Sequence, residues 1–259
     1  MSTSNLNKLE KSRGILAFAI NTDTTDYKKI AERTLPIASQ ILNLPYTLIT
    51  ETKTSFSNTR FDVDTGTFVE WKNFNRGTVY DFSPYDETLV IDVDYLVLND
   101  NLLKIFDQPW DYLLQRKSYS VTDEWPTTMG PNSLPYVWAT VFAFRKTERA
   151  KLFFNLVQRI QTNYSYYRLL FNVEERNFRN DYAFAMADII LNGYIVNHTG
   201  LTEDLLAFNR PILEMKLHQN KIIVRDENNT YVVPRTNLHI MSKAYLLSDN
   251  FGKLINELA

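Results

Sequence analysis

The chain has 259 residues, with 28 Lys and Arg against 30 Asp and Glu, three His and no Cys. Its 44% hydrophobic and 22% charged residues are typical of a globular protein long enough to bury a large core. The absence of Cys excludes disulfides, thiol nucleophiles and thiolate metal sites. A net charge of -2 argues against a dedicated nucleic-acid-binding domain, which carries a basic surface.

The first half of the sequence alternates strand and helix patterns. The apolar run 14–20 predicts a strand buried on both faces, and helical spacing over 26–42 predicts a helix that Asp26 caps and that Pro36 kinks or divides. A second strand is expected at 46–50. The order strand, helix, strand is typical of a parallel α/β sheet.

Short connecting elements are expected over 51–87, followed by further strands at 88–91, 95–98, 112–114 and 136–144 and helices at 102–106, 147–162 and 181–191. The prolines and the glycine of 115–135 predict a loop. The last part is expected to hold short strands at 194–197, 212–216, 221–225 and 230–233, and a short helix after Asp249.

The N-terminal segment 1–12 is a polar leader without the apolar core of a signal peptide. No apolar run reaches the ~20 residues that a membrane span needs. We therefore expect a cytoplasmic protein with no membrane contact, in which one domain covers residues 13–259.

None of the seven glycines stands at the spacing of the dinucleotide fingerprint or of the P-loop, in which backbone N–H groups approach phosphate. No Ser lies in a G-x-S-x-G motif. Any phosphate bound here must be neutralised by a metal or by side chains. With few His and many Asp, carboxylates are the expected ligands and bases.

Asp92 and Asp94 stand directly after the apolar strand 88–91. Ligands of open α/β sheets bind outside the carboxyl ends of strands, which is where these two side chains are expected. Two hard oxygen donors suit Mg²⁺ or Mn²⁺, and such an ion can bridge to a diphosphate. The alternative is a solvated strand end, because D-x-D alone is a common pattern.

Because it follows a buried strand within an α/β pattern, the Asp92/Asp94 segment resembles the D-x-D motif of the GT-A class of nucleotide-sugar glycosyltransferases. The resemblance is closest to the glycogenin and galactinol-synthase-like group and related phage-encoded enzymes. The resemblance runs from Gly14 to about Lys243 and is strongest at the two aspartates. It implies a single-domain, Rossmann-like α/β fold with a mostly parallel central sheet and flanking helices. It also implies Mn²⁺ or Mg²⁺ held against the diphosphate of a nucleotide sugar, with a UDP-sugar as the expected donor.

The resemblance implies roles for two pairs of polar residues. Asn21 and Asp23 fall where such enzymes contact the nucleotide base and ribose, and a helix cap before Tyr27 is the alternative. Asn180 and Asp181 fall where the group faces the sugar or the acceptor. Asp181 would orient a sugar hydroxyl or act as a base, and an ordinary helix N-cap is its alternative.

The resemblance also implies that His239 completes the metal shell and that Lys243 contacts the diphosphate. The family has Gly and then Pro-Trp after this Lys, whereas Ala244 and Tyr245 follow it here, so the match is partial. A purely structural histidine is the alternative for His239. We include Arg76, from the connecting region, among the candidate donor-binding residues.

A second charge pattern concerns the acceptor. Basic and aromatic side chains alternate over 144–179, as in proteins that grip a nucleic-acid strand, although helical spacing favours a core face and a solvated face. Some phage enzymes that resemble this chain glycosylate hydroxymethylated bases of their DNA. The loop 115–135, with Asp123, Glu124 and Trp125, is a candidate acceptor flap.

The sequence thus predicts a metal-dependent hexosyl- or pentosyltransferase that moves a sugar from a nucleoside diphosphate to a hydroxyl acceptor, with hydroxymethylated phage DNA as a candidate. A protein or glycan acceptor is an alternative, as is a non-catalytic protein with a degenerate GT-A fold. A nucleotidyltransferase is a further alternative, but it would usually show a glycine- and basic-rich first loop. Residues 21–26 have neither property.

Overall fold

The structure, a computed structural model, describes residues 11–50, 59–62, 67–70, 74–122, 129 and 134–258. Residues 1–10 of the expected leader 1–12 lie outside these ranges. The candidate flap residues Asp123, Glu124 and Trp125 also lie outside them.

A five-stranded central sheet runs through the molecule in the order β2 (Tyr46–Ile49), β1 (Arg13–Phe18), β5 (Glu87–Ile91), β9 (Trp138–Arg145) and β7 (Tyr112–Gln115). The pairs β1–β2 and β1–β5 are parallel, and β9 is antiparallel to both β5 and β7. Every residue of β5 is buried. The expected α/β class, with a mostly parallel central sheet and flanking helices, is confirmed.

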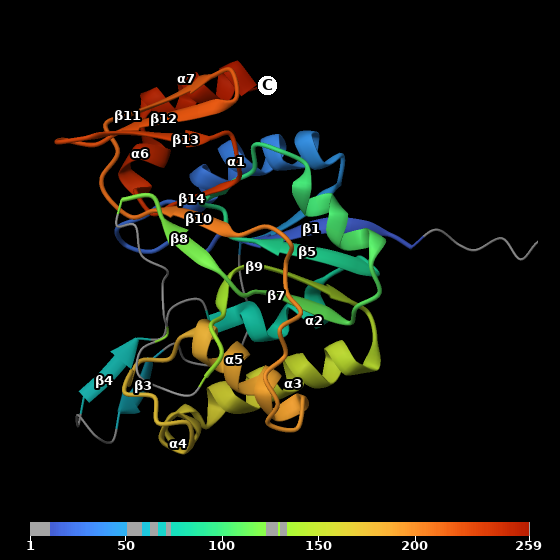
Figure 1. Ribbon diagram of the computed structural model, residues 1–259. Helices are drawn as coiled ribbons and strands as arrows, with labels where there is room; N and C mark the ends of the chain where they lie inside the picture. Colours follow the sequence, from blue (N-terminus) through green and yellow to red (C-terminus); the bar gives the residue numbers. More distant parts are fainter. Residues whose placement is uncertain are drawn as a thin grey trace, which may run out of the picture.

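Helices cover both faces of this sheet (Figure 1). Ile15 and Ala17 of β1 face α1 (Tyr27–Leu42), whereas Leu16 belongs to the core on the other side. That second core is formed with α2 (Val79–Phe82), α3 (Glu148–Thr162) and α5 (Asn180–Leu191). Alternation along one buried strand therefore supplies two hydrophobic layers. Pro36 does not divide α1, which is continuous over 16 residues.

A second sheet begins with β6 (Tyr95–Leu96), just after the carboxyl end of β5, and has the order β6, β14 (Leu238–Ile240), β10 (Leu205–Phe208) and β8 (Ser118–Ser120). Strand β14 is antiparallel to β6 and pairs His239 with Tyr95. Strand β8 lies within the expected loop 115–135, so that loop contains one short strand that was not predicted.

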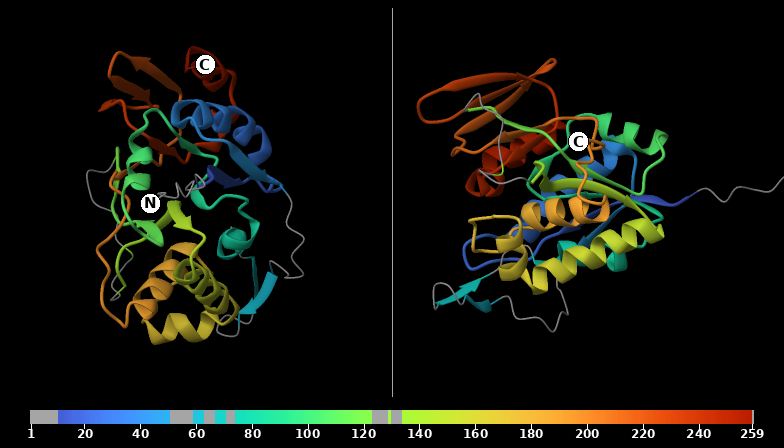
Figure 2. Two further views of the ribbon diagram at one scale, coloured as in Figure 1. Left: turned by 90° about the vertical axis from the view of Figure 1, so that its right-hand side faces the viewer. Right: turned by 60° about the horizontal axis from the view of Figure 1, so that its bottom comes forward.

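The C-terminal part forms an antiparallel meander of β11 (Glu214–His218), β12 (Lys221–Arg225) and β13 (Thr230–Pro234). It lies on the α1 side of the central sheet, together with α6 (Lys243–Leu247) and α7 (Asp249–Leu258) (Figure 2). The remaining elements are β3 (Thr59–Asp62), β4 (Thr67–Glu70), α4 (Tyr164–Leu170) and the 3-10 helices η1 (Phe74–Thr78) and η2 (Asn101–Asp107).

The strand expected at 194–197 is wrong. Tyr194 has a φ of 64°, in the left-handed region, and ends α5 in a turn rather than starting a strand. Among the described residues, no helix combines the length and the apolar character needed to cross a bilayer.

Gly14 is a packing requirement of β1. A Cβ at this position would lie 2.3 Å from the ring of Tyr85, whose hydroxyl hydrogen-bonds the Thr47 hydroxyl at 2.9 Å. We expect Gly14→Ala to lower the free energy of unfolding by about 1–3 kcal/mol, because the ring must move within a packed layer. Urea denaturation measures this loss, and the double variant Gly14→Ala/Tyr85→Ala should recover part of it.

Gly252→Ala is the matched control, because a Cβ there meets no atom within 4 Å in α7. Alanine is the better helix former, so this control should not lose stability. Equal effects of the two substitutions would contradict the packing role of Gly14.

Candidate functional site

The turn after β5 brings both aspartates of the D-x-D motif to the carboxyl end of the central sheet. The Asp92 amide donates to the Thr140 carbonyl of β9 at 2.9 Å, and the Tyr95 amide donates back to the Asp92 carbonyl at 3.0 Å. The turn is therefore fixed by backbone hydrogen bonds at both ends. Asp92 is partly exposed, and Asp94 is buried.

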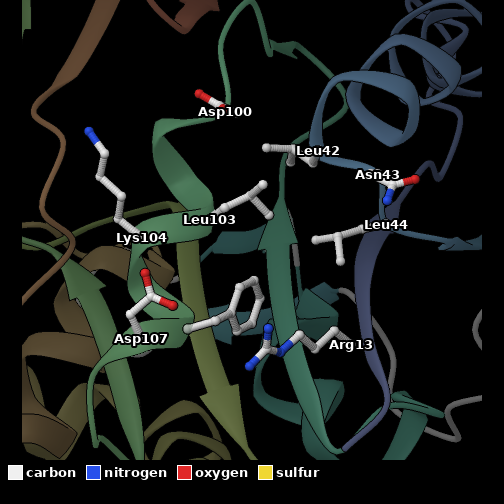
Figure 3. A pocket seen from close by; sticks show the side chains of 9 residues that line it. Arg13, Leu42, Asn43, Leu44, Asp100, Leu103, Lys104 and Asp107 are labelled. Carbon is white, nitrogen blue, oxygen red and sulfur yellow. The ribbon is translucent and has the colours of Figure 1, made fainter. Parts of the chain in front are cut away.

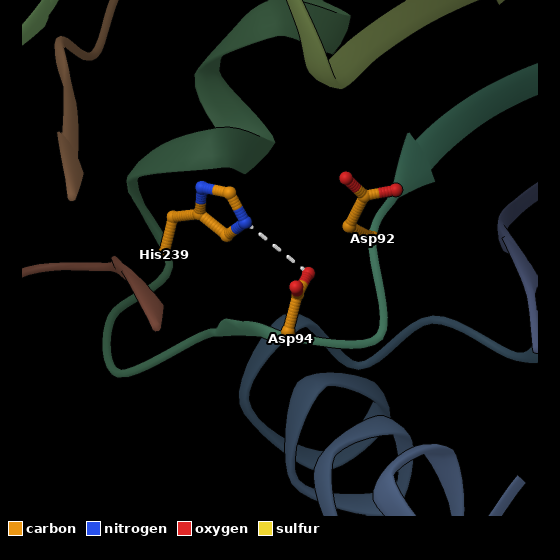
Figure 4. A group of neighbouring side chains, drawn as sticks. All are labelled: Asp92, Asp94 and His239. Carbon is orange, nitrogen blue, oxygen red and sulfur yellow. Dashed lines mark ion pairs between the residues drawn. The ribbon is translucent and has the colours of Figure 1, made fainter. Parts of the chain in front are cut away.

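Pairing of β14 with β6 brings His239 to the same place from far along the chain. The Ile240 amide donates to the Asp94 carbonyl at 2.9 Å, and His239 Nε2 lies 3.3 Å from Asp94 Oδ1. One ligand atom each of Asp92, Asp94 and His239 lies within 4.8 Å of the others (Figure 4). The structure thus assembles the three residues that the sequence analysis named as metal ligands.

The donor set of this cluster fits Mn²⁺ or Mg²⁺. Two carboxylates and one imidazole are oxygen and nitrogen donors that suit these ions. Neighbouring ligand atoms of an octahedral ion bound at 2.0–2.2 Å are roughly 3 Å apart, which is close to the observed His239–Asp94 separation. The Trp138 ring meets the His239 ring edge-on, with centroids 5.5 Å apart, and supports the imidazole from one side.

Each aspartate of the cluster is already paired with a permanent cation. The Arg76 guanidinium pairs with Asp92 and donates to the Ala139 carbonyl, and the Lys243 ammonium pairs with Asp94. Burial by itself would raise the pKa of Asp94, but His239 and Lys243 outweigh it and hold the pKa of this carboxyl well below its ordinary range. Burial lowers the pKa of Arg76, against the opposing effect of Asp181 and Asp94.

Asp181 is held next to the cluster by β9. Its Oδ1 accepts the Ala139 amide at 2.8 Å, while its Oδ2 pairs with Arg179 at 2.8 Å. The N-cap of α5 is Arg179, so Asp181 is in the first turn and the N-cap interpretation is wrong. Ala139 therefore links Arg76, through its carbonyl, to Asp181, through its amide. Asn180, which precedes Asp181, is buried.

Asn21 is part of the N-terminal cap of α1. It accepts the Lys28 amide at 3.0 Å and donates to Asp26 at 2.9 Å, while Asp26 accepts the Lys29 amide at 3.1 Å. The capping alternative thus accounts for the Asn21 side chain, and the predicted cap Asp26 is confirmed. Asp23 is exposed beside it.

Two aromatic residues near the cluster were not singled out in the sequence. Tyr27 begins α1, and burial raises the pKa of its hydroxyl, with Lys243 lowering it and Asp94 raising it. The other is Trp138, at the first position of β9. Neither lies in a motif, and only the fold places them beside the aspartates.

The basic and aromatic stretch 144–179 is mostly core. Six of its aromatic side chains are buried: Phe144, Phe153, Phe154, Tyr164, Phe171 and Phe178. Tyr166 is exposed, Tyr167 is half-buried, and Arg168 is buried. The amphipathic interpretation therefore accounts for most of this segment, and its buried rings cannot stack on bases.

A cavity of about 460 Å³ lies elsewhere, at the amino end of β1 (Figure 3). Its lining combines apolar and charged side chains, namely Arg13, Leu42, Asn43, Leu44, Asp100, Leu103, Lys104, Phe106 and Asp107. The aspartate cluster lies at the opposite, carboxyl end of the parallel strands, so this cavity is separate from it.

No family model matches the sequence, and no curated protein matches it. Glycosyltransferases are among the solved structures that are similar. One, involved in glycosylation of the major capsid of PBCV-1, is 13% identical, with 64% of this chain and 80% of that chain covered and a TM-score of 0.34.

A mutant Drosophila β-1,4-galactosyltransferase 7 in complex with manganese, UDP-Gal and xylobiose is 17% identical over 55% of this chain and 52% of that chain, with a TM-score of 0.31. The match thus spans about half of that enzyme's chain. The inositol-1-phosphate CTP transferase from T. maritima is 10% identical over 96% of both chains, with a TM-score of 0.42.

The lowered pKa of Asp94 has a consequence for stability. A carboxyl whose pKa is lower in the folded than in the unfolded chain, about 3.9, stabilises the fold above that pH and loses this contribution as the pH falls. We expect Asp94→Asn to destabilise the metal-free protein at pH 7, and the deficit to shrink below about pH 4. Urea unfolding in EDTA across this range measures it.

Asp204→Asn, at an exposed position, is the control for removing one acidic charge. A deficit of Asp94→Asn that stays constant or grows on acidification would show that the Asp94 charge does not stabilise the fold.

Proposed function

We propose that this chain is a metal-dependent glycosyltransferase that moves a sugar from a nucleoside diphosphate sugar, a UDP-sugar, to a hydroxyl acceptor. One observation carries the proposal: ligand atoms of Asp92, Asp94 and His239 lie within 4.8 Å of one another at the carboxyl end of the parallel strands. Ligands of open α/β sheets bind at this end. The sequence has no glycine loop for phosphate, so a diphosphate must be held by a metal or by side chains, and this cluster offers both.

Asp92, Asp94 and His239 would hold Mn²⁺ or Mg²⁺. When bound there, a divalent cation would neutralise the charge that develops on the departing diphosphate. Arg76 fixes the orientation of Asp92, because the guanidinium is tied to β9 as well. Lys243 is the cation at the open side of the cluster that can contact the diphosphate, with its side chain 24% exposed.

Asp181 and Asn180 are the candidates for contacts with the sugar or the acceptor. In the transfer, the bond from the anomeric carbon to the diphosphate oxygen breaks, a bond to the acceptor oxygen forms, and the acceptor hydroxyl gives its proton to a base, for which Asp181 is the candidate. Asp181 is partly exposed and fixed by Ala139 and Arg179, so it can accept a hydrogen bond from a hydroxyl in a defined position. Asp23 is exposed at the β1 end, where base and ribose are expected.

The acceptor class is part of the same proposal. Hydroxymethylated DNA stays the first acceptor to test, with protein and glycan acceptors as the alternatives. Within 144–179, the side chains left for a DNA contact are exposed ones such as Arg159, Tyr166 and Arg176. Transfer of label from a UDP-sugar to hydroxymethylated DNA, but not to plain DNA, would identify a DNA acceptor.

The donor assignment predicts metal-dependent binding and turnover. A thermal-shift screen of nucleotide sugars should raise the melting temperature only with Mn²⁺ present, because ligands stabilise the folded state by mass action. Asp92→Asn and Asp94→Asn should each lower Mn²⁺-dependent release of UDP from the matching sugar donor by about 100-fold or more, since the metal contributes several kcal/mol. Asp204→Asn is the charge-matched control.

Wild-type rates in both aspartate variants would overturn the metal-site assignment. Release of pyrophosphate from a nucleoside triphosphate, with no release of UDP from UDP-sugars, would instead identify a nucleotidyltransferase. Binding of UDP and Mn²⁺ without turnover of any donor would identify a non-catalytic nucleotide-binding protein.

A further inference from the structure

The candidate metal site is charge-balanced by the protein itself. Its two carboxylates, Asp92 and Asp94, face two permanent cations, Arg76 and Lys243. The Asp94 side chain is only 8% exposed, so water screens its ion pair weakly. A bare divalent cation would therefore bring two positive charges into a site that is already neutral.

The two cations differ in how firmly they are held. Arg76 is 7% exposed, and its guanidinium joins Asp92 to the Ala139 carbonyl, so a second contact keeps it in place if Asp92 turns toward a metal. Lys243 is more exposed, and Asp94 is the hydrogen-bond acceptor of its ammonium among the described residues. A lysine is a compact charge on a flexible stem, whereas an arginine fork is rigid. Lys243 is therefore the cation that can move.

Lys243 and a metal ion compete for the same carboxylate. The ammonium contacts Asp94 Oδ2, and His239 Nε2 is 3.3 Å from the other oxygen of this group. An ion bound by Asp94 and His239 would lie next to the Lys243 ammonium, and the two positive charges would repel each other. The repulsion is relieved if Lys243 turns to an anion placed on the far side of the metal.

We propose that Lys243 occupies Asp94 in place of the metal, and that its transfer from Asp94 to the diphosphate makes the divalent cation and the nucleoside diphosphate bind cooperatively. This inference rests on the proposed function, because it uses a metal and a diphosphate at the same site. Metal binding at Asp94 displaces the Lys243 ammonium, which is then free to pair with the diphosphate. Diphosphate binding in turn draws the ammonium away from Asp94 and leaves this carboxylate to the metal. Coupling of this kind is reciprocal.

Binding measurements on the full chain test the coupling without any turnover. Mn²⁺ binding is followed by the electron paramagnetic resonance signal of free Mn²⁺, with and without UDP, and UDP binding by calorimetry. For the wild type we expect UDP to tighten Mn²⁺ binding at least fivefold. For Lys243→Met we expect the opposite change in the two steps: tighter binding of Mn²⁺ alone, and weaker binding of UDP in the presence of Mn²⁺.

Two matched variants distinguish the coupling by Lys243 from the effect of replacing any lysine. Lys243→Arg keeps the cation beside Asp94, so binding of Mn²⁺ alone should stay weak. Lys253→Met removes an exposed lysine of α7 and should leave both affinities unchanged. Thermal unfolding of each variant checks that the fold is retained.

The outcomes distinguish the two proposals. If Mn²⁺ and UDP bind the wild type but Lys243→Met binds Mn²⁺ alone no more tightly, the coupling by Lys243 is wrong and the proposed donor site stands. If UDP does not change Mn²⁺ affinity in the wild type, the coupling is also wrong. If neither Mn²⁺ nor UDP binds, alone or together, the proposed function itself fails.

Discussion

Two carboxylates in one short turn at the end of a buried strand need compensating positive charge, and much of the surrounding structure supplies it. Asp92 and Asp94 follow β5, whose residues are all buried, and Asp94 is itself buried. Placing such a group inside a protein is unfavourable unless it is paired and hydrogen-bonded. In this chain a lysine and an arginine provide the positive charge, and His239 Nε2 lies 3.3 Å from Asp94.

The compensating groups come from segments that are distant in sequence. The antiparallel pairing of β14 with β6 sets His239 beside Asp94, and α6 begins four residues later with Lys243. Arg76 comes from η1 and is fixed on β9, where the same residue, Ala139, also holds Asp181 at the start of α5. Arg76, a candidate for the donor, and Asp181, a candidate for the sugar or the acceptor, are therefore both held by the first residues of β9. This arrangement is suited to holding two reactants in a fixed relation.

Segments with a clear apolar pattern could be predicted from the sequence, whereas three short strands of the second sheet could not. The first helix, the buried strand before Asp92 and β12 are found close to their expected residues, because apolar periodicity and turn residues mark them. The short strands β8, β10 and β14 carry too few residues for a periodic signal, and they form because tertiary pairing completes the second sheet. The D-x-D motif predicted two candidate ligands, Asp92 and Asp94, and the pairing of β14 with β6 places His239 beside them. The pairing of Arg76 with Asp92 and the position of Trp138 have no local signal at all.

In the proposed function, Asp92, Asp94 and His239 bind a divalent cation together with a nucleoside diphosphate. A crystal structure of the protein soaked with Mn²⁺ and UDP, with data collected at the manganese absorption edge, tests it most directly. We expect one anomalous peak within bonding distance of all three side chains, with the Lys243 ammonium on a phosphate oxygen rather than on Asp94. An anomalous peak elsewhere, or UDP bound with Lys243 still paired to Asp94 and no metal at the cluster, would contradict it.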